Sequence, residues 1–558
     1  MNILSRRSFL SHSTKLGLGT ALATLTDVPF VMKRALAEGS IGVPGANGRV
    51  KKLLFIFLRG ANDGLNTVIP FGDSAYGPPN RVDLEIKKDP VQPFTALGRV
   101  GFPEAGSAAG TYAHPYGLNL GNGFAALHPS LKFLSPIYNA GDLAAIHRVG
   151  YPRQSRSHFD SQNYWETGAP NDNNTKDGML YRAMVESGLA YTAPLTGVSI
   201  GSSLPLIFRG SKAAMTNVSD PTRFNLLAVP NTAQGNAKAD AFLAAANRTE
   251  FADKREREFL RLQYGNLASS LEIFASMDFS EAGNTYRDDI ATDGDTDYAN
   301  TSGGGYFLFP TTNEKNGGWR RSSNSTRADK YVVPTSSYDF FTRLKAAAMV
   351  LNKTDALVSG VSIDGWDTHS EQADQASADG TRGSHTGAHA NLLRRVGWAV
   401  YALNKYFTRY ADKCRWDDVA VVTLSEFGRT SVENSDNGTD HAEASVMFVA
   451  GGGIKGFEAG PLGEVRRTGV FNCGGSGDQS IPWQTGPNGT FFKATGRYLQ
   501  RNTDYRSVVG KLVRDHLGAT QEQLDRIIPG YTVASESLKN KGVQTRDNTA
   551  VVGEPDFI

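Results

Sequence analysis

Five short runs of Val, Ile, Leu and Phe restrict the fold of this chain more than any other feature of its sequence. They cover residues 53–58, 143–149, 356–363, 419–424 and 446–450. None of them alternates between apolar and polar residues, which is typical of strands that are covered on both faces. Apolar residues at three- and four-residue spacing predict a helix over 390–410, and a second, more charged helix is predicted over 251–274. Strands alternating with helices predict an α/β fold with a mostly parallel central sheet and helices on both faces.

The N-terminus predicts export. Arg6 and Arg7 stand before an aromatic residue and a leucine, a moderately apolar stretch follows over 16–31, and Ala35-Leu36-Ala37 has the small-x-small pattern of a cleavage site. We therefore expect residues 1–37 to be a twin-arginine signal peptide, with the twin-arginine translocase as a partner during export. The mature protein, residues 38–558, is expected to be periplasmic or secreted.

Length and composition limit the domain organisation and the partners that we expect of the mature protein. Its length of about 520 residues fits one large α/β domain with insertions, and stretches rich in Gly, Asn, Ser and Pro mark probable surface insertions at about 280–335 and 471–489. The 58 basic and 56 acidic residues are nearly balanced and form no basic run, so no nucleic-acid partner is expected. No apolar stretch of the mature chain reaches the length of a membrane span. Cys414 and Cys473 permit one disulfide without requiring it.

Carboxylates and imidazoles follow or precede several of these runs. The carboxyl ends of parallel strands meet at one edge of a sheet, where ligands bind, so such side chains can converge from distant segments. Oxygen and imidazole ligands in this mixture suit one or two divalent cations: zinc, manganese, magnesium or calcium. Asp63 and Asp440 also fit the simpler interpretation of turn formers. The candidate ligands are Asp63, Asp367, His369, Glu426, Asp440 and His441.

Three further motifs allow alternative interpretations. The segment 155–161 leads into a predicted helix start, where Ser157 is either an activated nucleophile or a helix cap and Arg156 an anion clamp. The sequence Gly-Val-Ser-Ile-Gly at 197–201 matches the nucleophile elbow of serine hydrolases at Ser199, although Pro205 disfavours the required helix. Acidic residues alternate at 293–297 as in a calcium loop, but tyrosine replaces the glycine that such a loop needs.

With these segments assembled, the chain resembles the exported bacterial family called domain of unknown function 1501, in the alkaline-phosphatase and sulfatase-like superfamily. The resemblance is carried by the sequences FLRGANDGLN (57–66), SHFDSQNYWETG (157–168), GWDTH (365–369), EFGRT (426–430) and GTDH (438–441). It implies an alkaline-phosphatase-like fold, with Asp63 as the first carboxylate ligand and Ser157 or His158 at the nucleophile position. It further implies Asp364 or Asp367 with His369 on one metal, Glu426 on the other, and His441 on the first.

The sequence also departs from the superfamily. Ser425-Glu426 stands where phosphatases carry an Asp-His pair, which leaves one imidazole ligand missing or supplied by His158. Neither cysteine lies in the context from which sulfatases make formylglycine. The resemblance favours a metal-dependent hydrolase or transferase of phosphate, sulfate or related esters, with an anionic ester or surface polymer as its ligand. The alternatives are a non-catalytic periplasmic or cell-surface binding or assembly protein that retains the fold, and a serine hydrolase that uses Ser199.

Overall fold

The structure of the chain is a computed structural model. It describes residues 40–45, 47–90, 116–191, 195–211, 213, 215–220, 237–238, 241, 269–288, 306–312, 315, 335–378, 382–474, 481–532, 538–539, 543–544, 550–551 and 553–558. The predicted signal peptide and the acidic stretch 293–297 lie outside these residues, as does most of the helix predicted over 251–274.

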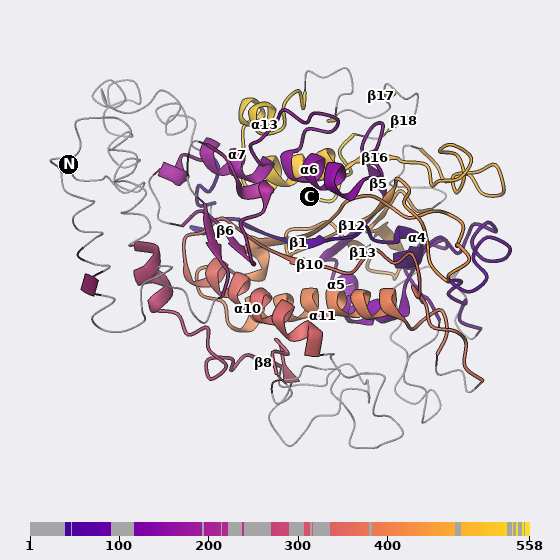
Figure 1. Ribbon diagram of the computed structural model, residues 1–558, viewed down its shortest axis with the longest axis horizontal. Helices are drawn as coiled ribbons and strands as arrows, with labels where there is room; N and C mark the ends of the chain where they lie inside the picture. The colour runs from indigo at the N-terminus through magenta and orange to yellow at the C-terminus, as the bar shows by residue number, and fades with distance from the viewer. Residues whose placement is uncertain are drawn as a thin grey trace.

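A nine-stranded sheet forms the centre of the molecule (Figure 1). Its order is β15-β5-β12-β11-β1-β10-β6-β7, with β16 also paired to β5. The strands are β1 (Lys52–Leu58), β5 (Leu143–Gly150), β6 (Gly197–Ile200), β7 (Thr216–Val218), β10 (Val358–Ile363), β11 (Val419–Ser425), β12 (Ser445–Ala450), β15 (Val470–Phe471) and β16 (Thr503–Asp504). All five predicted strands are therefore present in this one sheet.

The sheet is mostly parallel, as predicted, and β12 is the exception. It pairs antiparallel with both of its neighbours, β11 and β5. The chain leaves β11 at the carboxyl edge and enters β12 from the same edge, without a helix that would carry it back across the sheet. The segment immediately before β12 therefore lies beside the segments that follow the parallel strands.

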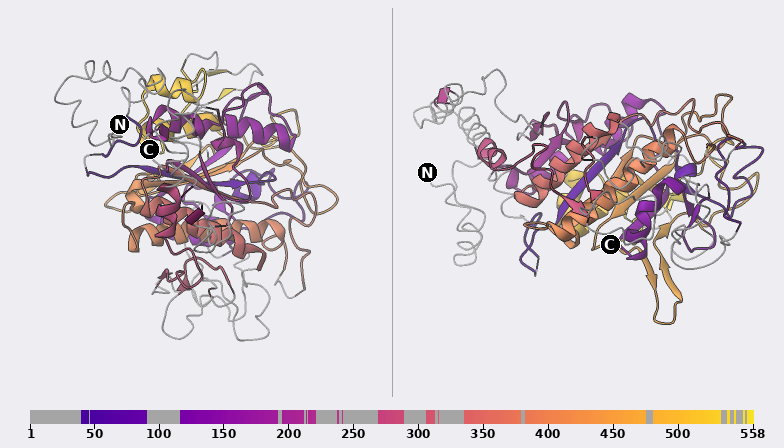
Figure 2. Two further views of the ribbon diagram at one scale, coloured as in Figure 1. Left: turned by 60° about the vertical axis from the view of Figure 1, so that its left-hand side comes forward. Right: turned by 90° about the horizontal axis from the view of Figure 1, so that it is seen from below.

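Helices cover both faces of the sheet (Figures 1 and 2). One face packs against α10 and α11, and the other against α6, α7, α12 and α13. The predicted helix over 390–410 is confirmed as α11. The helices are α4 (Gly64–Thr67), α5 (Ser135–Asn139), α6 (His158–Thr167), α7 (Met179–Glu186), α10 (Tyr338–Lys353), α11 (Ala388–Arg409), α12 (Tyr505–Lys511) and α13 (Gln521–Ile527). Short turns of 3₁₀ or π helix occur at Pro129–Leu134, Leu189–Tyr191, Leu206–Phe208, Thr335–Ser337, Trp416–Asp418 and Leu512–His516.

Burial on both faces explains why the strand runs do not alternate. Along β1, Leu54 and Ile56 belong to the core under α10 and α11, whereas Phe55 and Phe57 belong to the core under the opposite helices. Each strand position therefore faces an apolar layer, and a polar side chain at either face would be desolvated without a partner.

The described parts of the two stretches predicted as surface insertions include residues that pack against the core. Phe471 begins the stretch 471–489 as part of β15, and Trp483 is buried with its indole N–H donated to Asp73, 2.7 Å away. In the other stretch, β8 (Arg287–Asp288) pairs with β9 (Tyr306–Phe307), and the Tyr286 ring packs on Tyr406 of α11. Aromatic residues within Gly-rich sequence provide this apolar area.

Smaller sheets complete the described fold. β2 (Val68–Ile69), β3 (Leu118–Asn119) and β4 (Ala126–Leu127) form one, β13 (Phe457–Ala459) and β14 (Val465–Thr468) form a hairpin, and β17 (Val543–Gln544) pairs with β18 (Ala550–Val551). Cys414 and Cys473 are both buried and free. Among the described helices, none has the length and apolar character that a bilayer crossing requires.

Candidate metal centre

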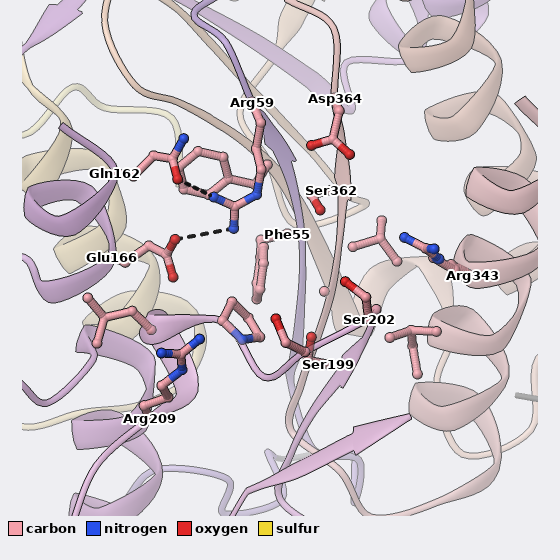
Figure 3. A pocket seen from close by; sticks show the side chains of 18 of the residues that line it. Phe55, Arg59, Gln162, Glu166, Ser199, Ser202, Arg209, Arg343, Ser362 and Asp364 are labelled. Carbon is pink, nitrogen blue, oxygen red and sulfur yellow. Dashed lines mark hydrogen bonds and ion pairs between the residues drawn. The ribbon is translucent and has the colours of Figure 1, made fainter. Parts of the chain in front are cut away.

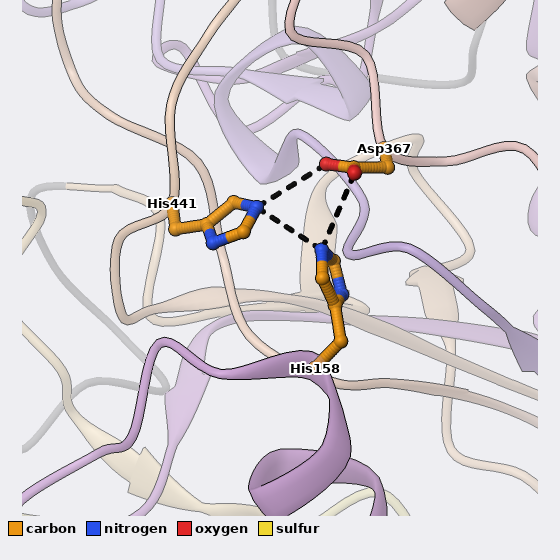
Figure 4. A group of neighbouring side chains, drawn as sticks. All are labelled: His158, Asp367 and His441. Atoms are coloured by element: carbon orange, nitrogen blue, oxygen red, sulfur yellow. Dashed lines mark hydrogen bonds and ion pairs between the residues drawn. The ribbon is translucent and has the colours of Figure 1, made fainter.

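Three histidines and an aspartate meet at the carboxyl edge of the central sheet. His158 is the first residue of α6, in the segment after β5, and Asp367 and His369 lie in the loop after β10. His441 precedes β12, whose reversed direction brings it to the same edge. Figure 4 shows the side chains of His158, Asp367 and His441 turned toward one another.

The Nε2 atom of His441 is at the centre of this group. It lies 3.0 Å from Nε2 of His158, 2.8 Å from Nε2 of His369 and 3.2 Å from Oδ1 of Asp367. The Asp367 oxygens also lie 3.1 Å from the His369 ring and 3.4 Å from the His158 ring. We call these four residues the histidine cluster.

The other nitrogen of each ring defines its tautomer. In each case Nδ1 faces an oxygen that can accept a hydrogen bond, and the tautomer that donates Nδ1–H to this oxygen would direct the Nε2 lone pair into the cluster. The acceptors are the Arg156 carbonyl for His441 at 2.8 Å, the Glu426 carboxylate for His158, and the Asp440 carboxylate for His369 at 3.0 Å. This is the arrangement in which proteins hold histidine ligands of metals.

In that tautomer, three bare nitrogens and a carboxylate would repel one another at these distances unless positive charge lay between them. A proton on His441 would be disfavoured, because burial and then the charge of Arg429 lower the pKa of this imidazole. Around the cluster, the carboxylates of Asp367, Asp440 and Glu426 outnumber the single guanidinium of Arg429 by two negative charges. One divalent cation would balance that excess.

Arg429 holds Asp367 in its ionised form. Its Nη2 lies 2.5 Å from Oδ1 of Asp367, and the buried guanidinium also donates to the carbonyls of Ala61 and Thr439. Partial burial acts to raise the pKa of Asp367, but the hydrogen bond and charge of Arg429 outweigh it and leave this pKa below its ordinary value. The second oxygen, Oδ2, is the one directed toward His158.

The distances suit a transition metal ion. His158, Asp367 and His441 each offer one ligand atom, all within 4.8 Å of one another, and this is the one group of its kind in the described parts of the chain. Ligands of a tetrahedral zinc ion at about 2.0–2.1 Å lie about 3.3 Å apart. The ring nitrogens therefore need to separate by only a few tenths of an ångström to receive the ion, with His369 alongside as a further imidazole.

Asp63, predicted as a metal ligand, has a different role. Its side chain caps α4 by accepting from the backbone N–H groups of Leu65 and Asn66, and it is fully buried against Arg81 and Gln372, each 2.6 Å away. All of its acceptor positions are thus occupied by donors within the protein. The simpler interpretation of an aspartate after a strand, as a turn and cap former, describes this residue.

Other predicted ligands occupy the surroundings of the cluster. Glu426 is fully buried and accepts from the Gly60 backbone N–H, from the Gln162 amide and from His158, so it orients that ring. Asp440 orients His369 in the same way. Asp364, the alternative to Asp367, lines a separate cavity and is not part of the cluster.

The two candidate serine nucleophiles and Arg156 lie outside the histidine cluster, whereas His158, the other candidate for the nucleophile position, belongs to it. Ser157 is the N-cap of α6, with its hydroxyl accepting from the Asp160 N–H at 3.4 Å. Ser199 is a buried residue inside β6, which continues to Ile200, so no strand-to-helix elbow forms there. Arg156 is exposed, and its guanidinium donates to the Tyr498 hydroxyl at 2.8 Å.

Several residues that shape the site were not recognised as candidates from the sequence. They are Arg429, which fixes Asp367; Gln162, which holds Glu426; and Phe427, whose ring lies 4.9 Å from that of His158 and 4.7 Å from that of His441. Arg429 and Phe427 adjoin Glu426 in the sequence, and Gln162 lies one helical turn beyond His158. Their short distance in the sequence from Glu426 or His158 was the signal that could have identified them.

The fold and the cluster define a class: an α/β protein with a histidine–carboxylate centre at the carboxyl edge of a mostly parallel sheet. Within that class the chain belongs to the family described as protein of unknown function (DUF1501), whose family model matches residues 50–468. No curated protein and no solved structure matches the chain significantly. The matched residues include every member of the histidine cluster.

Proposed function

We propose that this chain is an exported metal-dependent hydrolase or transferase that acts on phosphate, sulfate or related esters. The observation that carries the proposal is the convergence of three Nε2 atoms on Asp367, with each Nδ1 facing an oxygen acceptor. A purely structural histidine needs one partner for each nitrogen, whereas these three rings direct their second nitrogens at one another.

The residues of the cluster would bind an ion directly, and the residues around it would orient these ligands. His158, His441 and Asp367 would be ligands, with His369 as the adjacent fourth, while Glu426, Asp440 and Arg429 hold them in position. A divalent ion bound there would supply a Lewis acid for the ester and would acidify a water molecule. Arg156, exposed and fixed by Tyr498, is the candidate clamp for an anionic oxygen.

We further infer a relation to the alkaline-phosphatase and sulfatase-like superfamily. Support comes from the mostly parallel sheet and from a candidate centre assembled from loops at its carboxyl edge. The inferred centre differs in holding one ion rather than two, because Asp63 is occupied by Arg81. Ser157 is engaged as a helix cap, so water is the nucleophile in this proposal.

Metal analysis and ester turnover test the proposal together. Protein exported by its native route should contain about one divalent ion per chain, because one ion balances the cluster. It should hydrolyse a panel of aryl phosphate and sulfate esters, and chelation should abolish that turnover. Bound metal without turnover would favour the non-catalytic binding or assembly function, and metal-free protein of unchanged thermal stability would exclude the centre itself.

Export is tested separately. Replacing Arg6 and Arg7 together with lysine should leave full-length precursor in the cytoplasm, because the translocation receptor reads the paired guanidinium groups and lysine cannot reproduce their geometry. Cell fractionation followed by immunoblotting measures the distribution. Replacing Arg466 and Arg497, which are exposed and lie beyond the predicted cleavage site, with lysine provides the control. Normal processing of the double-lysine variant would contradict the assignment.

A further inference from the structure

A second cavity lies beside the histidine cluster, at the same edge of the sheet. It has a volume of about 440 Å³, within the range of small-molecule sites, and lies between β1, β10, β6, α6 and α10 (Figure 3). We propose that it binds a saccharide that carries an anionic substituent, and that such a sugar is the part of the substrate remote from the reacting ester. This inference rests on the proposed function and names its substrate class.

Helix α6 connects the cavity to the histidine cluster. His158, Gln162 and Glu166 recur at four-residue spacing and therefore follow one face of the helix, the first toward the cluster and the other two toward the cavity. Gln162 donates to Glu426, the partner of His158, and accepts from Arg59 at 3.0 Å. One turn of helix, about 5.4 Å, separates adjacent members of this series, so one small ligand can span both sites.

The cavity combines aromatic surface with hydroxyl groups. The ring of Phe55, which is 3% exposed, packs over Gly360 of β10, where a Cβ atom would approach it to 2.1 Å, so the glycine makes room for this ring at the floor of the cavity. Phe159 lines the cavity with 84% of the residue exposed, which places it at the rim. Hydroxyl and amide groups surround these rings, from Ser199, Ser202, Ser203, Ser362, Gln162 and Asn163.

This combination matches the chemistry of a sugar. A sugar ring has an apolar C–H face that packs on an aromatic ring and a rim of hydroxyls that need both donors and acceptors. An exposed phenylalanine is otherwise unfavourable in contact with water. Asp364, an exposed carboxylate at the end of β10, adds an acceptor for hydroxyl groups.

A guanidinium group of the lining offers N–H donors to an anionic substituent. Arg59 pairs with Glu166 at 3.2 Å and Arg343 with Asp339 at 2.6 Å, which leaves Arg209 and Asp364 as the charged groups of the lining outside these pairs. Figure 3 shows Arg209 and Arg343 on opposite sides of Ser199 and Ser202. Arg343 pairs with Asp339 through Nη2, but its buried Nε has no hydrogen-bond acceptor among the described residues.

Arg209 is exposed and uses its Nε for the carbonyl of Leu204 at 2.6 Å. The structure describes no acceptor for its terminal nitrogens. The terminal nitrogens of Arg209 can therefore bind a sulfate, phosphate or carboxylate without breaking a described ion pair.

Binding is tested on the His441→Ala chain in the presence of a chelator, so that the result does not depend on the metal centre. The probes are N-acetylglucosamine 6-sulfate, unmodified N-acetylglucosamine, inorganic sulfate and adenosine monophosphate, with dissociation constants from calorimetry or ligand-observed NMR. The sulfated sugar should bind at least about tenfold more tightly than either the neutral sugar or inorganic sulfate.

Two variants assign the contacts. Arg209→Gln should reduce the preference for the sulfated sugar to about the level of the neutral one, and Phe159→Ser should weaken both sugars about tenfold. Arg466→Gln and Leu462→Ser, at similarly exposed positions on and beside the β13–β14 hairpin, should change neither. Equal affinity for both sugars, preferential binding of the nucleotide, or no response to these two variants would overturn the proposal, whatever the metal content and ester turnover of the wild type prove to be.

Discussion

Affinity for zinc should fall by about 100-fold or more when His441 is replaced by alanine. Its Nε2 atom contacts all three other members of the cluster, His158, His369 and Asp367, so its loss opens a coordination position that no neighbouring side chain fills. Loss of a residue that only orients a ligand typically costs 10- to 100-fold in affinity, and loss of a ligand should cost at least as much. Competition with a chelating indicator measures the change.

Folding should survive this substitution. The side chain of His441 is 24% exposed at the sheet edge. In the metal-free protein its removal therefore takes away a partly exposed ring and no part of the apolar core. Without metal, we expect the free energy of unfolding to change by less than about 1 kcal/mol. An unchanged zinc affinity would show that His441 is not a ligand.

His516→Ala is the matched control. His516 is a buried histidine whose ring nitrogen lies 2.8 Å from the backbone carbonyl of Lys52, which is not part of the histidine cluster. Its removal leaves that carbonyl without its partner and should cost about 1–3 kcal/mol of stability while zinc affinity is retained. The two variants thus separate a metal ligand from a structural histidine.

Replacing Arg81 with methionine should destabilise the fold by about 3–5 kcal/mol near neutral pH. Arg81 and Asp63 form an ion pair at 2.6 Å in which neither side chain is exposed. Methionine fills part of the volume but leaves the carboxylate buried without its counter-ion, which is far costlier than loss of a surface pair. Urea unfolding at pH 7.5 measures the difference from wild type.

The effect should depend on pH in a defined direction. Burial acts to raise the pKa of Asp63, but Arg81 outweighs it and the pKa lies below its ordinary value. The wild-type pair therefore stabilises the fold above the pKa of an unfolded aspartate, and this contribution is lost as the pH falls through the lower folded pKa. In the variant the carboxyl group of Asp63 stays buried without a cationic partner, so its pKa rises. Protonation then removes the buried charge and lowers its cost to stability.

The stability difference between wild type and Arg81→Met should therefore shrink as the pH is lowered from 7.5 to 5. Adding Asp63→Asn to the variant should restore much of the stability at pH 7.5, because no buried charge then remains. A loss below about 1 kcal/mol at pH 7.5 would mean that the pair contributes no more than a surface ion pair.

The strands of the central sheet could be predicted from sequence because their signal is local. Each predicted run is a continuous apolar segment, and the sheet buries both of its faces. The reversed direction of β12 could not be predicted in this way, since an isolated apolar run has the same composition in either direction. That direction depends on the path of the chain between β11 and β12, which stays at one edge of the sheet.

The sequence predicted where the candidate site lies better than it predicted what each residue does there. Polar residues after the strands indicated the carboxyl edge, and His158, Asp367, His369 and His441 do meet there. Asp63 carries the same local signal, an aspartate after a buried strand. Its role differs because Arg81, eighteen residues later, binds it in the interior.

The sequence by itself determined the mostly parallel α/β architecture and the edge at which chemistry-bearing side chains gather, because burial pattern and strand ends are properties of short segments. Only the tertiary structure decided which carboxylates face the cluster and which are neutralised elsewhere. Those roles depend on which distant donor reaches each oxygen: Arg81 for Asp63, His158 for Glu426 and Arg429 for Asp367. The partners of these pairings lie 18, 268 and 62 residues apart in the sequence, and no local pattern encodes the distance between two side chains that meet only when the chain has folded.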